Sequence, residues 1–471
     1  MLEKSSSAAV RSGDWLARIV PKALIVLMAL CVVLGGIWTF YNVKWSAQLT
    51  RQLEAWQAAG LPMSMSDVIP QPIPATQNAA PVYLQVFHVS FDPSSQASRS
   101  SSDLAGLSRD EVERLDDYRL GRERDKNAAA VRGILERPQV ADTLAALKQA
   151  SEYPKAVFPI KWQLGYSVIL PHLAKFRSAT RLVAVQAIVL AEDNRLEEAL
   201  DWCLTGLRMA DHVAQEPSLV AQLVATAMRD MIFGAIEEII SDHPLPSTTM
   251  QSLQQHLQGV DVYGSFDGGL RSEAAQGCSM FAQFRTDAQV VHDLMQDTIG
   301  HPALSHIWGV YCSWLGQPLR NFDEATFLRL MARQVQASGR PYLEAKAELD
   351  AIEPQLREAR MAMLSAMIVP VYARVYSKRD ASVTRVDLCR IALALKSYKS
   401  HHGQYPQNLA QLQHELPWTL PKDVFSGRDF IYRRQAEGFL IYSVGPDFDD
   451  DGGAKYQWDT RNGDILWTAQ S

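Results

Sequence analysis

The sequence predicts a mainly α-helical protein with an N-terminal transmembrane helix, a body of helical hairpins, and a small C-terminal α+β domain that contains an antiparallel sheet. Three observations lead to this fold class: an uncharged apolar run near the N-terminus, apolar residues at helical spacing through the middle, and short alternating segments near the end. With 471 residues, 47% of them hydrophobic, the chain can form two or three folding units. Its net charge of -6 provides no basic surface, so we expect no nucleic-acid partner.

The apolar run is residues 23–43, which contain no charged residue. At about 1.5 Å per residue it is long enough to cross a hydrocarbon core of about 30 Å. Basic residues dominate the preceding segment and aromatic residues cluster at the far end, which predicts a single-pass protein of the bacterial inner (cytoplasmic) membrane with residues 1–22 inside and the bulk periplasmic. The basic residues are Lys4, Arg11, Arg18 and Lys22, and the aromatic ones are Trp38, Tyr41 and Trp45. A cleaved signal peptide is the alternative, but no small-x-small site precedes Lys44.

Residues 44–107 are expected to form a neck and a linker. A short helix over 46–59 leads into a stretch with five prolines over 61–81, which favours extended backbone. The serine-rich segment 94–102 has too few apolar residues to fold and predicts a loop. Ser108 followed by Glu111 is a capping-box pattern, and it marks the start of a helical body over 108–360.

The helical body shows apolar periodicity almost throughout. The pattern is clearest in 217–240, where one apolar stripe lies opposite Arg229, Asp230, Glu237 and Glu238, charges that argue against a second membrane span. Residues 181–217 resemble one tetratricopeptide unit, but no second copy follows, so an ordinary antiparallel hairpin is favoured. We expect helices over 171–192, 196–214, 217–240, 248–257, 270–297, 323–337 and 341–376.

Residues 153–172 differ from the rest of the body because prolines alternate with aromatic residues there. Tyr153, Phe158, Trp162 and Tyr166 are the aromatic residues. This composition is typical of a groove for a peptide or polymer ligand. It is also typical of a segment that covers the end of a helical core.

Residues 361–471 predict the α+β domain. A helix over 387–399 ends at Gly403, and Asn408 caps a short helix over 409–414. Strands are expected over 430–433, 438–444 and 465–468, in a small antiparallel sheet packed against the first helix. The chain here reads His-His-Gly-Gln-Tyr-Pro over 401–406, then Pro-Lys-Asp-Val-Phe-Ser-Gly over 421–427, and Gly-Pro-Asp-Phe-Asp-Asp-Asp-Gly-Gly over 445–453.

Those motifs, in that order behind a helix, resemble the globular head of type II secretion pseudopilins. The resemblance covers 361–471 only. Pseudopilins carry a processing site and a glutamate near the start of their membrane helix, and neither apolar segment of this chain has them. The resemblance therefore implies a pilin-derived head on another anchored protein. The whole chain also resembles uncharacterised single-pass envelope proteins of planctomycete-type bacteria, which implies no particular activity.

The acidic segment Asp447-x-Asp449-x-Asp451-Gly resembles the first half of a calcium loop, because alternate carboxylates on a tight turn can meet at one hard cation. The pseudopilin resemblance also implies a calcium-supported loop in this place. Position twelve would be Trp458 rather than glutamate, so Asp459 or Asp464 would have to stand in. We predict Asp447, Asp449, Asp451 and Asp459 as ligands of calcium; a solvated acidic turn remains the alternative.

The sequence contains no recognised catalytic motif, which favours a non-enzymatic role. His301 and His306 are spaced unfavourably for a metal site. Five cysteines, Cys31, Cys203, Cys278, Cys312 and Cys389, are scattered singly, and a disulfide between Cys278 and Cys312 is conceivable. The leading hypothesis is a membrane-anchored extracytoplasmic scaffold or protein-interaction protein with a protein partner. The alternatives are an accessory component of a type II secretion or pilus-like assembly, and an extracytoplasmic hydrolase.

Overall fold

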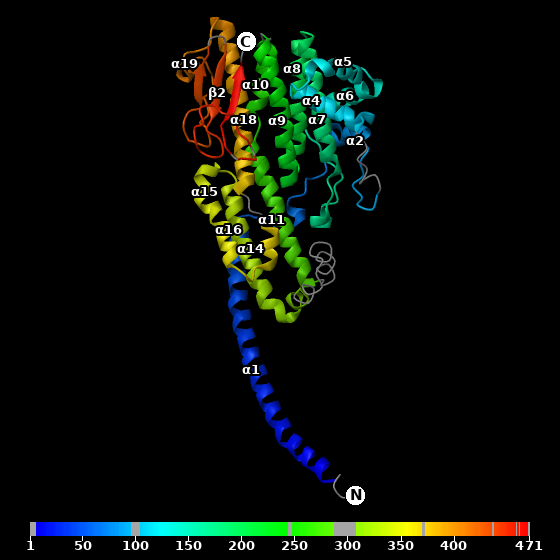
Figure 1. Cartoon of the computed structure of the whole chain (residues 1–471), viewed down its shortest axis with the longest axis vertical. Helices are drawn as coiled ribbons and strands as arrows, with labels where there is room; N and C mark the ends of the chain where they lie inside the picture. Colours follow the sequence, from blue (N-terminus) through cyan, green and yellow to red (C-terminus); the bar gives the residue numbers. More distant parts are fainter. Residues whose placement is uncertain are drawn as a thin grey trace. The chain divides into compact units, whose positions relative to one another are not determined.

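The computed structural model describes residues 6–95, 104–243, 247–286, 308–369, 373–435, 438–457, 459–460 and 462–469. The protein is mainly helical, with a three-stranded antiparallel sheet near the C-terminus, which confirms the predicted fold class (Figure 1). It divides into two compact units, each built from several segments. Unit 1 contains Met1–Leu61, Met280–Met331 and Pro354–Pro370, and unit 2 contains Pro62–Ser279, Ala332–Glu353 and Val371–Ser471.

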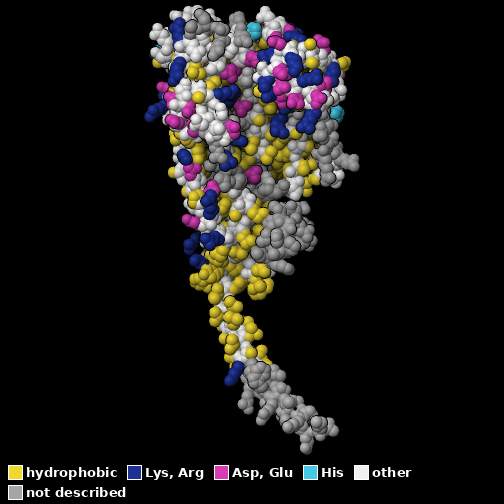
Figure 2. Space-filling view, viewed as in Figure 1, with side chains coloured by type: hydrophobic (Ala, Val, Ile, Leu, Met, Phe, Trp, Pro, Cys, Tyr) yellow, Lys and Arg dark blue, Asp and Glu magenta, His cyan; other side chains and the backbone are white. Residues whose placement is uncertain are grey.

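Unit 1 contains the long N-terminal helix α1, Ser6–Ala58. Apart from Trp38, its apolar side chains from Val20 to Val43 are exposed (Figure 2), and the helix is long and apolar enough to cross a membrane. The expected separate neck helix is the continuation of α1. On this continuation Trp45 and Trp56 are buried against aromatic rings of α14, which begins at Gln317 and ends at Ala337. The C-terminal part of α1 therefore has one face packed inside unit 1.

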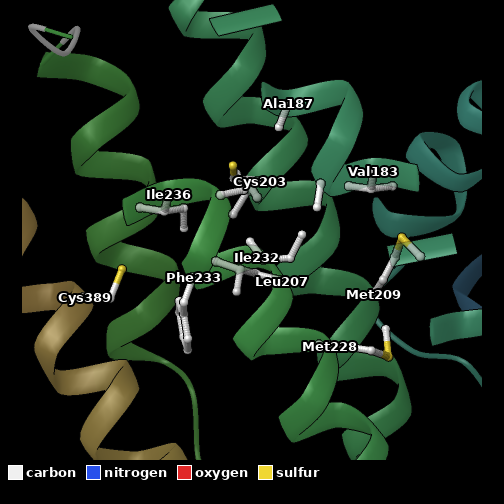
Figure 3. Packing of buried hydrophobic residues seen from close by; sticks show 14 of the residues in the cluster. Val183, Ala187, Cys203, Leu207, Met209, Met228, Ile232, Phe233, Ile236 and Cys389 are labelled. Carbon is white, nitrogen blue, oxygen red and sulfur yellow. The ribbon is translucent and has the colours of Figure 1, made fainter. Parts of the chain in front are cut away.

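Unit 2 is organised around three consecutive helices: α7, Pro171–Glu192; α8, Leu196–Ala214; and α9, Leu219–Asp242. The bounds of α7 and α8 match the prediction. Close packing is possible because Gly206 of α8 faces Val183 of α7 and Ile232 of α9, with side chains from all three helices filling the core (Figure 3). Helix α9 is long and apolar enough to span a membrane. However, more than half of its most apolar 18-residue stretch is buried inside the protein, so it is a core helix as expected.

Shorter helices on both sides of α7 to α9 in the sequence add to unit 2. Ser108 accepts a hydrogen bond from the Glu111 amide at 3.3 Å, and Glu111 Oε2 accepts one from the Ser108 amide at 2.8 Å, which confirms the capping box. The predicted serine-rich loop lies largely outside the described residues. The α-helices are α2, Ala80–Phe87; α4, Arg109–Arg119; α5, Arg124–Leu135; α6, Pro138–Ser151; and α10, Ser247–Gln258; short 3-10 helices are η1, Met65–Asp67; η2, Ala75–Gln77; η3, Leu104–Gly106; and η4, Trp162–Ser167.

Four helix predictions were wrong in their bounds. The helix expected over 323–337 already begins at Gln317, and the helix expected over 387–399 is only the C-terminal part of α18, Ala373–His402. The helix expected over 270–297 is α11, Val262–Thr286, and residues 287–297 lie outside the described part. The single helix expected over 341–376 is interrupted several times. One cause is Pro370, because a residue before proline is pushed to extended backbone, and Val369 has φ -84° and ψ 99°. The elements found are α15, Tyr342–Asp350; α16, Ile352–Glu358; α17, Met363–Ile368; and α18, Ala373–His402.

The sheet has the order β1-β2-β3, with β1 at Ile431–Arg434, β2 at Phe439–Ser443 and β3 at Ile465–Ala469. Both pairs are antiparallel, and the register sets Ile441 opposite Tyr432 on one side and Trp467 on the other. Gly403 ends α18 with φ 74°, and Asn408 caps α19, Leu409–Gln413, as predicted.

The sheet also packs on the helical body. The ring of Trp467 in β3 lies 6.3 Å from that of Phe233 in α9, and Glu237 Oε1 accepts a hydrogen bond of 3.0 Å from the amide of Thr468. The buried faces of α18, the sheet and α7 to α9 belong to one hydrophobic core. The C-terminal strands are therefore part of unit 2.

Candidate functional site

A cavity of about 950 Å³ in unit 2 brings together the proline-rich and the aromatic-rich segments. We call it the proline-lined groove. One wall is formed by residues 69–73 with the start of α2, the other by residues 155–160 with Trp162, and Gln215, Glu216 and Pro217 complete the lining. The segment predicted to form a groove or to cover the helical core does both, since Phe158 and Trp162 line the groove and are also buried in the core.

Asn78 joins the two walls. Its Nδ2 donates to the carbonyl oxygen of Val157 at 3.0 Å, and its Oδ1 accepts from the amide of the same residue at 2.9 Å. The Ala79 amide donates to the Lys155 carbonyl oxygen at 2.8 Å. Prolines in both walls hold the backbone extended and prevent further pairing. The groove is therefore bounded by extended chain held by side-chain hydrogen bonds.

A buried histidine and glutamate lie at the groove. Nε2 of His172 lies 2.6 Å from Oε1 of Glu216, which itself lines the groove. Both side chains are buried, and among the described residues His172 Nδ1 and Glu216 Oε2 have no hydrogen-bond partner. The imidazole ring is covered by Phe158 and Phe91, at centroid distances of 4.4 and 5.2 Å. A water, an ion or a ligand bound at the groove could complete the hydrogen bonding of these two atoms.

Sequence reasoning missed this pair. The two residues are 44 positions apart and come from different elements, His172 from the first turn of α7 and Glu216 from the turn after α8. Neither lies in a motif. They lie close together because α7 and α8 are antiparallel, so that the end of α8 lies beside the start of α7.

A second cavity of about 470 Å³ shares Pro70, Gln215, Glu216 and Pro217 with the groove. It extends the recess toward Asp67 and Arg271. Glu216 thus lies where an apolar recess meets a charged one. A ligand spanning both would meet apolar side chains at one end and charges of both signs at the other.

The predicted calcium residues lie on the loop between β2 and β3, together with Asp464 directly before β3. Asp447 Oδ2 accepts a hydrogen bond of 2.7 Å from the Gly463 amide, and Asp449 Oδ1 accepts one of 3.0 Å from the Asp450 amide. Asp459 is exposed. In the described part of the chain, no three His, Cys, Asp or Glu side chains are grouped so that they could hold a metal ion. The structure thus does not bring the four predicted ligands into a preassembled set.

Asp464 is the buried member of this loop. Its Oδ2 accepts a hydrogen bond of 2.6 Å from the Gly453 amide, while its Oδ1, like Oδ2 of Asp451, is buried without a hydrogen bond to any described residue. Burial raises the pKa of Asp464, the nearby Asp450 and Asp451 carboxylates add to the rise, and the Gly453 and Asp451 amides oppose it. The chain segments around Gly453 and Gly463 can approach each other closely because these two glycines adopt φ 92° and 110°.

The remaining candidate residues are two histidines and the five cysteines. His301 and His306 lie outside the described residues. All five cysteines are free thiols, so the conceivable bridge between Cys278 and Cys312 is not formed. Burial raises the pKa of the Cys278 thiol, which makes that side chain a poor nucleophile.

Comparisons with known proteins add no assignment to these sites. Protein-family models, curated proteins and solved structures were compared with the chain, and none of them matches it.

Proposed function

We propose that the protein is a membrane-anchored extracytoplasmic scaffold that binds an extended segment of a protein partner in the proline-lined groove. The proposal places residues 1–22 in the cytoplasm of a bacterial cell, residues 23–43 in the inner membrane and the rest in the periplasm. The excess of Lys and Arg before the apolar run supports this direction. The exposed apolar surface of α1 supports the anchor.

The observation that carries the proposal is a groove between two extended walls with an incompletely hydrogen-bonded pair beside it. An extended peptide fits between extended walls better than a compact ligand does, because its side chains alternate between them. Leu84, Phe158 and Pro159 favour apolar side chains of the partner. Lys155 and Glu216 provide one charge of each sign, which would set the direction of the bound chain.

Site-directed photo-crosslinking in cells tests this binding. Benzoylphenylalanine replaces Gln71, an exposed residue lining the groove, in one variant, and Leu120, an exposed residue outside it, in another. We expect a discrete protein adduct from position 71 and none from position 120. The adduct should disappear when Leu84→Arg is added, because that change places a charge in the apolar lining. Adducts that persist with Leu84→Arg would refute the groove as the binding site.

We further propose that calcium binds the loop between β2 and β3 and stabilises it. The predicted ligands are Asp447, Asp449, Asp451 and Asp459, and the burial of Asp464 supports its replacing Asp459 in the set. Two buried carboxylate oxygens without partners, on Asp451 and Asp464, support a cation there, because like charges in a buried site are costly unless neutralised. The solvated-turn alternative fits the exposed Asp449 and Asp450 but leaves the buried Asp464 unexplained.

A hydrolase is the second candidate, favoured by the His172 and Glu216 pair. A carboxylate bonded to Nε2 orients an imidazole whose Nδ1 is available as a general base. Phe158 covers the ring and would have to move for a substrate to reach it. Assays of the purified full chain on unfolded proteins and chromogenic esters test it. Activity must be lost in His172→Gln and kept in His401→Gln; equal activity in both, or none in the parent, removes this candidate.

A role as an accessory component of a type II secretion or pilus-like assembly is the third candidate. Helix α18 packed against a three-stranded antiparallel sheet is the arrangement that the pseudopilin resemblance implies. A strain that lacks the protein should then show a changed set of exported proteins. An unchanged set would leave the scaffold as the better proposal.

A further inference from the structure

Residues 308–316 of unit 1 form a compact turn that carries exposed apolar side chains. A helical turn over 308–312 is followed by the 3-10 helix η5, Trp314–Gly316. Val310, Trp314 and Leu315 are 56%, 68% and 50% exposed. Exposed apolar residues that cluster on one turn, in contrast to single ones, indicate a surface that meets something other than water.

The turn lies directly against α1, within the same unit. The rings of Trp38 and Trp314 meet edge to face at a centroid distance of 5.5 Å, and Nε1 of Trp38 donates to the carbonyl oxygen of Leu315 at 3.0 Å. Trp38 lies five residues before Val43, the end of the apolar run. At about 1.5 Å per residue it is about 7.5 Å inside that end. The turn therefore reaches the depth of the lipid interface, where interfacial segments bury about 5–10 Å.

Several carbonyl groups of the turn accept hydrogen bonds from side chains of the protein. Ser313 Oγ donates to the carbonyl oxygen of Val310 at 2.7 Å, and Arg320 Nη1 donates to that of Ser313 at 2.7 Å. The Leu315 carbonyl oxygen is the one that accepts from Trp38. Carbonyl groups exposed to water do not need such partners, whereas carbonyl groups that face lipid do.

Buried contacts on the side of the turn away from solvent fix its conformation. Tyr311 is buried, and its hydroxyl donates to Oδ2 of the buried Asp323 at 2.9 Å. A side chain on Gly316 would collide with the carbonyl oxygens of Val310 and Tyr311, so the chain can turn this tightly only at a glycine. The exposed side chains are thus presented by a fixed scaffold.

We propose that Val310, Trp314 and Leu315 insert into the lipid interface beside α1, giving the protein a second contact with the leaflet from which α1 emerges. The inference rests on the proposed anchoring role of α1. Lipid is the occupant that the observations favour, because the apolar surface of α1 continues onto this turn through Trp38 and because Trp is enriched at membrane interfaces. A second copy of the chain covering the turn is the competing outcome.

Photo-crosslinking in vesicles of phosphatidylethanolamine and phosphatidylglycerol tests the inference on the full chain. Benzoylphenylalanine is placed at Leu315, at Val310, at Val33 within the apolar run, and at the exposed Leu120 of unit 2. We expect a mass increase of one phospholipid at Leu315, Val310 and Val33, and none at Leu120. Lipid adducts at Val33 alone overturn the inference but leave the anchor standing. Failure at Val33 as well would overturn the anchor.

A second measurement needs no crosslinker. Brominated acyl chains quench the fluorescence of tryptophans that contact lipid, and we expect Trp314→Tyr to remove part of that quenching. Unchanged quenching, or a crosslink from Leu315 to a second copy of the chain, contradicts lipid insertion.

Discussion

The hydroxyl oxygen of Tyr83 lies 2.9 Å from Nδ1 of His212, and Nε2 of the same ring lies 2.8 Å from the carbonyl oxygen of Tyr153. A neutral imidazole satisfies both contacts, because Nε2–H donates to the carbonyl group and Nδ1 accepts from the hydroxyl group. The pair joins α2 to α8 and holds the chain that leads into the second wall of the proline-lined groove. Burial lowers the pKa of His212, which also favours the neutral ring.

This arrangement predicts that acid destabilises the protein through His212. A lowered pKa in the folded state means that the unfolded chain takes up the proton first, so the stabilisation is complete above pH of about 6.5 and is lost as the pH falls toward the folded value. Thermal unfolding between pH 8 and pH 5 should show a steeper loss for the parent than for His212→Gln. The exposed His401→Gln is the control and should follow the parent. Parallel curves for all three proteins would show that His212 does not contribute.

Calcium should raise the unfolding temperature through Asp464. We expect millimolar calcium to stabilise the parent, Asp459→Asn and the control Asp429→Asn, an exposed residue outside the loop. Asp464→Asn should abolish the calcium effect. Without calcium it should unfold at a higher temperature than the parent, because an amide keeps the contact with Gly453 and carries no buried charge.

The roles of the other aspartates follow from the same titration. Loss of the calcium effect in Asp459→Asn but not in Asp464→Asn would restore the set predicted from the sequence. No calcium effect in the parent, with no change in Asp449→Ala, would establish the solvated turn.

Close contact between α8 and α9 predicts opposite effects for two glycine substitutions. A side chain at Gly206 would meet Ile232 and would lie 3.3 Å from Cγ1 of Val183, whereas Gly234 of α9 has no atom within 4 Å. We expect Gly206→Ala to cost about 1–3 kcal/mol of unfolding free energy from overpacking. Gly234→Ala should stabilise by about 0.5–1 kcal/mol from helix propensity. Urea unfolding measures both, and equal effects would contradict the packing in Figure 3.

Asp323 should be essential to unit 1. Its carboxylate accepts hydrogen bonds from the amides of Leu364 and Ser365 at 2.7 and 2.9 Å and from the Tyr311 hydroxyl. Because removing it leaves buried donors without an acceptor, Asp323→Ala should cost about 3 kcal/mol. Limited proteolysis of the detergent-solubilised protein should then cut within 308–369, whereas the exposed Gln317→Ala should leave the pattern unchanged. An unaltered pattern in Asp323→Ala would contradict this role.

Local signals explain which elements the sequence predicted well. Helices α7 and α8 have dense apolar periodicity, a proline at the first position of α7, and the Asp193-Asn194 turn, where Asn194 adopts φ 59°. Asn408 and Gly403 are likewise local capping signals. The prediction of one helix over 341–376 was wrong in part because apolar periodicity continues across Val369 and Pro370, whereas a residue before proline is pushed to extended backbone.

The sites depended on contacts between residues far apart in the sequence. The acidic loop could be identified as a cation candidate from its spacing, but Asp459 and Asp464 were equivalent until the fold buried one and exposed the other. His172 and Glu216 carried no sequence signal at all.

The sequence by itself determined the long apolar N-terminal helix, the helical character of the body and the three short strands, because chain length, side-chain periodicity and capping act between near neighbours. Only the tertiary structure decided that β3 packs on α9, that two proline-rich segments enclose one groove, and that Trp38 meets Trp314. These contacts depend on how whole helices pack. The free energy of packing comes from many side chains that are far apart in the sequence, so no single residue or local pattern indicates it.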